Sequence, residues 1–559
     1  MESTLQIIFG LLGGLAVFIF GMNMMSECLQ KAAGEKMKSI LAMLKKNPLM
    51  GVLAGALTTA VLQSSSATTV MAIGFVSAGL MTLPQSISII LGANIGTTMT
   101  AQVIAFKISD YIFLFIFAGF AVSYIAKSEK AVNIGQTVFA FGLLFLGIET
   151  MGDVMKPLAS SPFFLSVIDR VSGIPALGVL AGTVMTLVVQ SSSATIAVLQ
   201  NFAQQPGPDG VTSILGLAGA IPFLLGDNVG TTITALLASI GQAKDAKRTA
   251  LAHCIFNLSG CLLFIWFVRP YAAFITWISP AGPQVEVISR QIANAHTMFN
   301  LVMTVIWTPL LPFMVKMVSR LVRESPKSLQ LASDPLYLDS KLTAQPAAAL
   351  HLAAQEVVRC SRMTGELLED ISGSILTEDG AALIPVLKKS DDVRTLNEHI
   401  MDYLAELFSA GSMSEEQTNE AAGMMYLMSD LDRMASLGRE MTDSIGERLE
   451  HNYKYSKDAM KDLQKALCLV SDMYQESVLM VKNGDCERAG KIHKKKGKLY
   501  DISLHMRKEH MNRVSKGKCS AKLTKPFNRI LNTLDRMANN CANIADAAAG
   551  QGLYGYFTV

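Results

Sequence analysis

The sequence predicts an all-α protein in two parts: a polytopic membrane domain and a soluble helical bundle. Charge distribution is the first observation, because residues 1–320 hold 29 of the 93 Asp, Glu, Lys and Arg residues and residues 321–559 hold the other 64. The second is a pair of uncharged stretches, residues 47–106 and 171–208. Such stretches are typical of membrane helices, whereas dense charge is typical of a soluble domain.

These observations predict the domain boundaries. We expect a transmembrane domain at 1–320, a linker at 321–345 around Pro326 and Pro335, and a helical domain at 346–551. The net charge of +3 is too small to indicate nucleic acid binding. The eight cysteines show no CxxC spacing, so no zinc site or disulfide framework is expected. About six helices fit the last domain, with breaks near Gly373, Gly411, His451, Gly484 and Gly517.

Full-length membrane spans are expected near residues 5–25, 110–127, 132–152, 249–268 and 291–317. The first is expected to be a retained helix, because Met1–Thr4 lacks a basic n-region. Residues 28–46 are amphipathic and Lys-rich, and we expect them on the membrane surface.

A polar motif interrupts each uncharged stretch. Gln63-Ser64-Ser65-Ser66-Ala67-Thr68 recurs as Gln190-Ser191-Ser192-Ser193-Ala194-Thr195. A helix rises ~1.5 Å per residue, so the ~14 apolar residues on either side reach only ~21–23 Å of a ~30 Å hydrocarbon core. The motifs are therefore predicted at the tips of two re-entrant helical hairpins.

A second motif is also duplicated. Gly92-Ala93-Asn94-Ile95-Gly96-Thr97-Thr98-Met99-Thr100 is similar to Gly226-Asp227-Asn228-Val229-Gly230-Thr231-Thr232-Ile233-Thr234. Its apolar flanks predict a membrane helix that is broken at each Asn-x-Gly, where glycine permits an unwound turn.

The duplication covers most of the membrane domain, as one repeat at about 10–130 and another at about 135–310. Gly51–Gly55 recurs as Gly178–Gly182 at the serine offset of 127, and Phe20-Gly21 corresponds to Leu146-Gly147. Positive charge predicts an outside N-terminus, a cytoplasmic helical domain and inverted repeats. The residues assigned inside are Lys31, Lys36, Lys38, Lys45, Lys46, Lys127, Lys130, Lys244, Lys247, Arg248, Lys316, Arg320 and Arg323; Lys107, Lys156, Arg170, Arg269 and Arg290 fall outside.

The serine motifs allow two interpretations. Serines can form a close helix–helix contact. Alternatively, hydroxyls and the N–H groups that begin the second hairpin helix can bind a small oxyanion. Identical motifs in both repeats favour the oxyanion site. The candidate residues are Ser64, Ser65, Ser66, Thr68, Ser191, Ser192, Ser193 and Thr195.

These motifs contain no Arg or Lys, so a bound dianion is expected to need co-bound cations. Asp227 is the one charged residue between Asp209 and Lys244, and an intramembrane carboxylate indicates function. A protonated or structurally paired carboxyl is the alternative. The oxygen-rich candidates for sodium or coupling are Gln63, Gln190, Asn94, Thr97, Thr98, Asp227, Asn228, Thr231 and Thr232.

Two further patterns each allow two interpretations. Ala252–Asn257 and Ala295–Asn300 share a His-x-x-x-Asn pattern, so His253 and His296 serve either packing or proton sensing. In the last domain most charges indicate solvated helix faces, while Asp432, Asp443, Asp535 and Asp546 are candidate metal ligands. No nucleotide-binding loop or catalytic triad pattern occurs, so no enzyme activity is expected.

The paired QSSSAT and Asn-x-Gly-Thr-Thr motifs resemble the sodium/phosphate cotransporter family over about residues 10–310. The last domain resembles the PhoU family of phosphate-signalling proteins. The PhoU-like acidic pairs are here Asp432…Ser436 and Asp535…Asn539, and each lacks its second carboxylate. Metal other than sodium is therefore not expected.

The resemblance implies sodium-coupled symport of inorganic phosphate by alternating access in the cytoplasmic (inner) membrane of a bacterium. Phosphate, sodium and the lipid bilayer are the expected partners, with no cofactor beyond the coupling ion. A homodimer and a cytoplasmic regulatory partner of the PhoU-like domain are left open. So are two alternatives: a carrier of another small oxyanion, and a membrane phosphate sensor that signals through the last domain.

Overall fold

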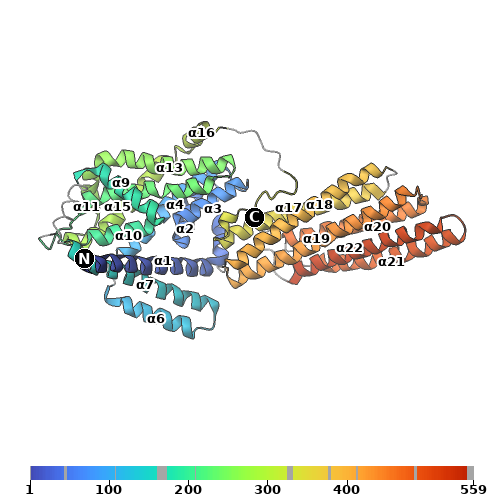
Figure 1. Ribbon diagram of the computed structural model, residues 1–559, viewed down its shortest axis with the longest axis horizontal. Coiled ribbons are helices and arrows are strands. Elements are labelled where there is room, and N and C mark those ends of the chain that lie inside the picture. The colour runs from blue at the N-terminus through green and yellow to red at the C-terminus, as the bar shows by residue number, and fades with distance from the viewer. Residues whose placement is uncertain are drawn as a thin grey trace. The chain divides into compact units, whose positions relative to one another are not determined.

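The computed structural model describes residues 2–42, 47–106, 109–159, 173–207, 209–323, 331–375, 379–410, 413–483 and 488–550. These residues are helical or in turns and loops, with one isolated β-bridge between Pro206 and Ser213, so the predicted all-α class is confirmed. The chain divides into two units, Met1–Ser325 and Pro326–Val559 (Figure 1). Several positions used above lie outside the described residues: Lys45, Lys46, Lys107, Arg170, Pro326, Gly411 and Gly484.

The first unit contains the two repeats in chain order. The first repeat comprises α1 (Glu2–Ala42), α2 (Pro48–Leu62), α3 (Ser65–Ser77), α4 (Leu83–Gly96), α5 (Thr98–Ile104), a 3-10 turn (Ser109–Tyr111) and α6 (Ile112–Ile125). The second comprises α7 (Glu129–Ala159), α9 (Pro175–Val189), α10 (Ser192–Ala203), α11 (Gly216–Gly230), α12 (Thr232–Ser239), α13 (Lys244–Phe264), η3 (Ile265–Phe267), α14 (Val268–Ile278), α15 (Gln284–Trp307) and α16 (Leu311–Leu321).

Five helical stretches among the described residues are long and apolar enough to cross a membrane, which makes this a multi-pass membrane protein. They are Gln6–Lys31, Leu83–Ile104, Glu129–Met155, Gly216–Ser239 and Lys244–Ile278. The hairpin helices are shorter, as predicted, with α2 and α9 at 15 residues each. Large side chains on α6 face outward, since Phe113, Phe117 and Ile125 are about 70 % exposed or more. Such a face suits a lipid environment.

Three predicted elements of the membrane domain were wrong in their extent. The span expected at 110–127 is the 14-residue helix α6, which is shorter than a full membrane span. Residues 28–42 are not a separate surface segment, because α1 runs without a break to Ala42. The span expected at 291–317 is not one helix, because α15 and α16 meet at an angle of 83°. Pro309 and Pro312 at this junction explain the bend, since proline lacks the N–H that would continue the helix.

Close backbone contacts hold the first helix of each hairpin against the helix that follows the hairpin, α4 or α11. A Cβ atom at Gly92 would lie 1.9 Å from the carbonyl oxygen of Val52, and one at Gly226 would lie 2.0 Å from that of Val179. Glycine is therefore required where α4 packs on α2 and where α11 packs on α9. The same contacts in both repeats show that the duplicated sequences fold alike.

The expected unwound turns at Asn-x-Gly are absent. The helices are interrupted only at Thr97 and Thr231, whose φ and ψ of −63° and −25°, and −58° and −25°, remain helical. Gly96 has a different purpose, because a Cβ atom there would lie 2.5 Å from the carbonyl oxygen of Ala56. The motif glycines serve close packing rather than backbone unwinding.

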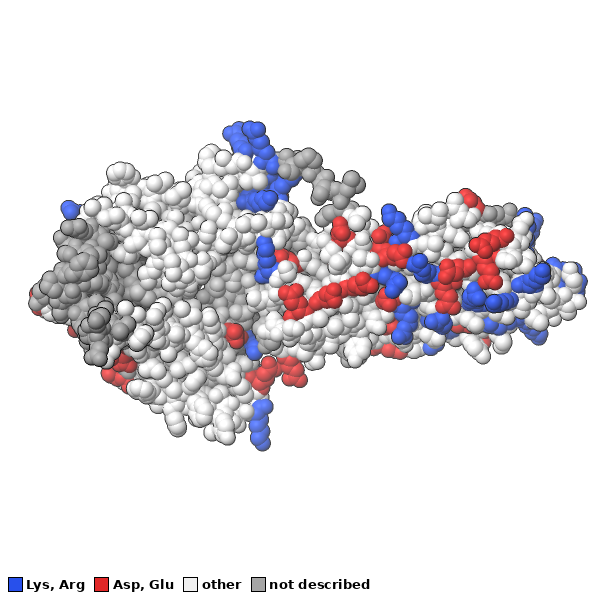
Figure 2. All heavy atoms as spheres, in the orientation of Figure 1, with Lys and Arg blue, Asp and Glu red and all other residues white. Residues whose placement is uncertain are grey.

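The second unit is a bundle of six long helices in the described residues, in agreement with the number expected. They are α17 (Pro346–Ile375), α18 (Leu383–Ser409), α19 (Glu415–Glu450), α20 (Lys457–Asn483), α21 (Ala489–Ser515) and α22 (Thr524–Gly550). Helices α17, α18 and α19 pack together, as do α20, α21 and α22, and α19 contacts α22. Figure 2 shows acidic and basic side chains along the surface of this unit, whereas the first unit is largely uncharged.

Candidate functional site

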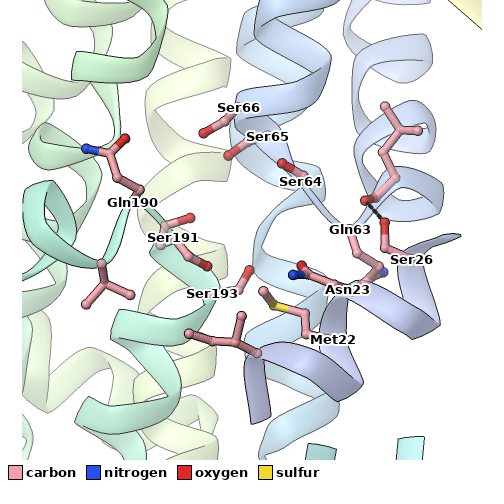
Figure 3. A pocket seen from close by; sticks show the side chains of 14 residues that line it. Met22, Asn23, Ser26, Gln63, Ser64, Ser65, Ser66, Gln190, Ser191 and Ser193 are labelled. Atoms are coloured by element: carbon pink, nitrogen blue, oxygen red, sulfur yellow. Dashed lines mark hydrogen bonds between the residues drawn. The ribbon is translucent and has the colours of Figure 1, made fainter. Parts of the chain in front are cut away.

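The two serine motifs line one pocket of about 250 Å³ (Figure 3). Its walls come from the α2–α3 tip, the α9–α10 tip and one face of α1. No charged side chain is among the lining residues that the structure describes. They are Ile19, Met22, Asn23, Ser26, Leu62, Gln63, Ser64, Ser65, Ser66, Val189, Gln190, Ser191, Ser192 and Ser193.

Each tip is shaped by a glutamine in a left-handed backbone conformation. Gln63 has φ 52° and ψ 22° at the end of α2, and Gln190 has φ 57° and ψ 20° at the end of α9. This region is sparsely populated by residues other than glycine, and such conformations cluster at functional sites. The identical geometry turns the chain at once into the second helix of each hairpin, so both serine runs face the pocket.

The first serine of each motif caps the helix that follows. Ser64 Oγ accepts a 3.1 Å hydrogen bond from Ala67 N, and Ser191 Oγ accepts one of 3.2 Å from Ala194 N. The next two residues of each motif occupy the first helical positions, where N–H groups have no intrahelical acceptor. These N–H groups and the positive end of the helix dipole suit a bound anion.

The two glutamine side chains line the pocket, but their amide groups are already engaged. Gln63 Nε2 donates to the Ala60 carbonyl oxygen at 2.5 Å, and Gln190 Nε2 donates to that of Leu187 at 2.6 Å. Gln63 Oε1 also accepts a 2.9 Å bond from Thr100 Oγ1. The glutamines thus fix the tips, beside which the serine hydroxyls and the N–H groups that begin the second helices are available to a ligand.

Thr68 and Thr195 do not line the pocket. They are buried behind it, where Thr68 Oγ1 lies 2.8 Å from Thr59 Oγ1 and Thr195 Oγ1 lies 3.2 Å from Thr186 Oγ1. Thr186 also donates a 2.7 Å hydrogen bond to Oδ1 of the fully buried Asp227. The carboxylate therefore sits one layer behind the second hairpin tip.

The remaining sodium candidates also lie behind the pocket. The amides of Asn94 and Asn228 donate to the carbonyl oxygens one helical turn earlier. The hydroxyls of Thr98 and Thr232 donate across the helix interruption to the carbonyl oxygens of Ile95 and Val229. Thr97 and Thr231 are buried beside them. The structure thus separates a polar pocket from a buried oxygen-rich layer.

The histidine pair lies in this buried layer. His296 Nε2 is 3.3 Å from Asn228 Oδ1, while neither ring nitrogen of the buried His253 has a hydrogen-bond partner within the described residues. Asn257 and Asn300 each donate back to the histidine carbonyl oxygen of their own helix. The packing and proton-sensing interpretations both remain predictions.

Sequence reasoning missed the α1 wall, which contributes Ile19, Met22, Asn23 and Ser26. Ser26 Oγ donates a 2.5 Å hydrogen bond to the Leu62 carbonyl oxygen and so joins α1 to the first tip (Figure 3). No duplicated motif marks these positions, and the pairing of α1 with the tip is a tertiary contact.

In the second unit, three of the four candidate metal ligands lie beside basic side chains, and Asp443 is exposed on α19. Asp432 lies 3.5 Å from Arg394, Asp535 lies 3.3 Å from Arg507, and Asp546 lies 2.8 Å from His493 Nε2. No group of three or more His, Cys, Asp or Glu side chains suited to a metal occurs in the part of the chain that the structure describes.

Comparison with known proteins identifies both parts of the chain. Residues 17–153 and 154–278 match the family described as Na+/Pi-cotransporter, and residues 463–548 match the PhoU domain. No solved structure gives a significant match.

Named relatives cover most of the sequence. YqeW of Bacillus subtilis (strain 168), an uncharacterized protein, is 31 % identical over 305 residues, which is 55 % of this chain and 95 % of that protein. YjbB of Escherichia coli (strain K12), whose name provisionally assigns it to inorganic phosphate export, is 23 % identical over 505 residues, 90 % of each chain. The human sodium-dependent phosphate transport protein 2C is 41 % identical over 99 residues, 17 % of this chain and 15 % of that protein. The chain therefore belongs to the Na+/Pi-cotransporter family and carries a PhoU domain in its C-terminal half.

Proposed function

We propose that this protein is a sodium-coupled secondary transporter of inorganic phosphate that works by alternating access. One observation carries the proposal: two identical Gln-Ser-Ser-Ser tips from two repeats line a single pocket. The family and the names of the relatives support phosphate as the substrate.

Phosphate would be held by neutral donors. Hydroxyls and the first N–H groups of α3 and α10 supply hydrogen bonds, and the positive ends of both helix dipoles meet the anion from two sides. The pocket offers room for the ion and a few waters, since a water takes up about 30 Å³. No lysine or arginine competes for the charge, so co-bound sodium is needed to balance it.

Asp227 would help to hold the sodium that balances the phosphate charge. Its Oδ2 atom has no hydrogen-bond partner in the described residues, although the side chain is fully buried. A buried oxygen without a partner is costly unless a ligand completes it. Sodium accepts hard oxygen ligands, so we assign Asp227, with Thr186 and Thr195, to the coupling ion.

The repeats would be inverted in the membrane, with the pocket near the midplane and the PhoU domain in the cytoplasm. The positive-inside bias supports this topology in the inner membrane of a bacterium. The second unit would act in regulation rather than in transport, because Asp432 and Asp535 are each paired with an arginine and the described pocket lining comes from the first unit.

Transport can be tested in proteoliposomes that contain the purified full-length protein. Radiolabelled phosphate should accumulate when sodium is higher outside, and accumulation should stop when choline or potassium replaces sodium. Equal uptake in all three cations would overturn sodium coupling.

Substrate choice is tested in the same vesicles by adding unlabelled sulfate, phosphonate or dicarboxylate. Unlabelled phosphate should compete at lower concentration than any of the three, and the dicarboxylate least, since a compact pocket of neutral donors without an arginine does not suit a longer dianion. Stronger competition by another oxyanion would reassign the substrate and leave the coupled mechanism in place.

A further inference from the structure

We propose that Asn23 on α1 and Glu149 on α7 alternate as the side wall of the anion pocket. The pocket then presents a neutral amide to phosphate when it is open to one side of the membrane and a carboxylate when it is open to the other. This proposal rests on the transport function proposed above.

Asn23 is the amide in the pocket whose side chain makes no hydrogen bond among the described residues. This exposed side chain points into the cavity (Figure 3). The two other amides, of Gln63 and Gln190, are each held in place by one N–H bond to a backbone carbonyl oxygen. Asn23 therefore adds a donor to the pocket that neither serine motif supplies.

Glu149 is the counterpart of Asn23 in the second repeat. Phe20-Gly21 corresponds to Leu146-Gly147 at an offset of 126, and the same offset relates Asn23 to Glu149.

The packing of α1 against α7 follows the same correspondence between the two repeats. A Cβ atom at Gly21 would lie 2.7 Å from Leu144 N and 2.8 Å from the Ala140 carbonyl oxygen. One at Gly147 would lie 2.5 Å from Phe18 N and 2.6 Å from the Gly14 carbonyl oxygen. An offset of 126 converts Leu144 and Ala140 to Phe18 and Gly14, so the two helices are equivalent by sequence and by contact.

The hairpins, in contrast, contact these two helices differently. The tip of the first hairpin lies at α1, where Ser26 bonds to the Leu62 carbonyl oxygen. The far part of the second hairpin lies at α7, where Asn201 Nδ2 donates to the Ile148 carbonyl oxygen at 2.7 Å. Asn201 is ten residues beyond Ser191, roughly 15 Å along the helix.

In one repeat the hairpin tip lies at its long helix, and in the other the far part of the hairpin does. If the two repeats exchanged these arrangements, the second tip would move to α7 and the first tip would move away from α1. Inverted-repeat transporters move one repeat against the other around a site at the repeat interface, and an exchange of the two arrangements is such a movement. In the exchanged state the equivalents of Ile19, Met22, Asn23 and Ser26 would line the pocket. These are Phe145, Ile148, Glu149 and Gly152.

The exchange changes the charge beside the anion. An amide donates a hydrogen bond to phosphate, whereas a carboxylate repels it, and two like charges a few ångströms apart in a partly wet site differ by enough to change affinity about tenfold or more. Phosphate would thus bind tightly in the state that α1 lines and be released readily from the state that α7 lines. Ion gradients still set the net direction of transport.

The test measures the KM for radiolabelled phosphate in right-side-out and in inverted membrane vesicles from cells that express the full-length chain, always with an inward sodium gradient. Asn23→Asp should raise the KM about tenfold in one vesicle type and leave the other nearly unchanged. Glu149→Gln should lower the KM in the opposite vesicle type only. Glu27→Gln changes a charge on α1 outside the pocket lining and should alter neither value.

Asn23→Ala guards against misfolding of the charged variant, because it removes the donor without adding charge and should raise the KM in the same vesicle type as Asn23→Asp. Equal shifts in both vesicle types, or unchanged KM values for Glu149→Gln, would overturn the alternating wall. Wild-type vesicles without sodium-dependent phosphate uptake would instead overturn the transport function itself.

Discussion

Thr186 donates a 2.7 Å hydrogen bond to Oδ1 of Asp227, and this contact has no equivalent in the other repeat. There Thr59 and Thr68 bond to each other at 2.8 Å, and Ala93 occupies the position of the carboxylate. The duplicated threonine pair therefore has a carboxylate beside it in the second repeat only. The two repeats line one polar pocket together but differ in the buried layer behind it.

Asp227→Asn tests this asymmetry. The amide keeps the shape of the side chain but removes its negative charge, so we expect the sodium concentration for half-maximal phosphate uptake to rise about tenfold or more. Uptake in proteoliposomes at varied sodium measures it. Asp209→Asn, in an exposed loop, is the matched control. A sodium titration like that of the wild type would return Asp227 to a structural role.

The pocket serines give a second prediction. Ser65→Ala and Ser192→Ala each remove a hydroxyl from the pocket lining, and a hydrogen bond to a charged group contributes about 1.5–3 kcal/mol. We expect the KM for phosphate to rise about tenfold or more, with a smaller effect on sodium dependence. Ser123→Ala on α6 removes a hydroxyl that bonds only to the Phe120 carbonyl oxygen and should change nothing. Normal KM values in both variants would place the anion elsewhere.

The hairpins could be predicted because length and polarity are local properties. The runs beside the serine motifs are too short to cross a membrane, and the structure gives 15, 13, 15 and 12 residues for α2, α3, α9 and α10. Duplication then indicated that the two tips share one task. Both arguments need only the spacing of residues along the chain.

The features that the sequence did not predict depend on tertiary contacts. Glycine in Asn-x-Gly is compatible with either unwound backbone or close packing, and sequence alone does not distinguish them. The two tips instead have positive φ values at Gln63 and Gln190, residues that do not favour that conformation. Asn23 was missed because α1 otherwise appears as an ordinary apolar span, and only the position of the first hairpin brings it to the pocket.

The packing glycines give a third prediction. Gly92→Ala and Gly226→Ala would push a methyl group into the backbone of the neighbouring hairpin helix, and overpacking of this kind costs about 1–3 kcal/mol or more. We expect a lower melting temperature in detergent and less folded protein. Gly13→Ala is the control, because nothing lies within 4 Å of its added methyl group. Equal melting temperatures for all three variants would contradict the close helix contact.

The last prediction concerns the residues that lead into the helical bundle. Residues 332–337 are held on α17 by two buried side chains. Glu356 Oε2 accepts hydrogen bonds from Leu336 N at 2.8 Å and Tyr337 N at 2.7 Å. Arg359, which is hydrogen-bonded to Glu356, donates to the carbonyl oxygens of Ala332 at 2.9 Å and Asp334 at 2.6 Å. The segment entering the bundle is thus attached to it rather than free.

Glu356→Gln should release this segment, because the amide removes the charge opposite Arg359 and leaves a buried guanidinium without its carboxylate, at a cost of about 3–5 kcal/mol. Limited proteolysis of the full-length protein, followed by mass spectrometry, should show much faster cleavage at residues 331–339. Glu369→Gln, on an exposed face of the same helix, should leave the cleavage rate unchanged. If both variants are cleaved as slowly as the wild type, the backbone contacts hold the segment without the ion pair. If Glu356→Gln alone is cleaved faster and phosphate uptake is unaltered, the attachment positions the bundle without taking part in transport.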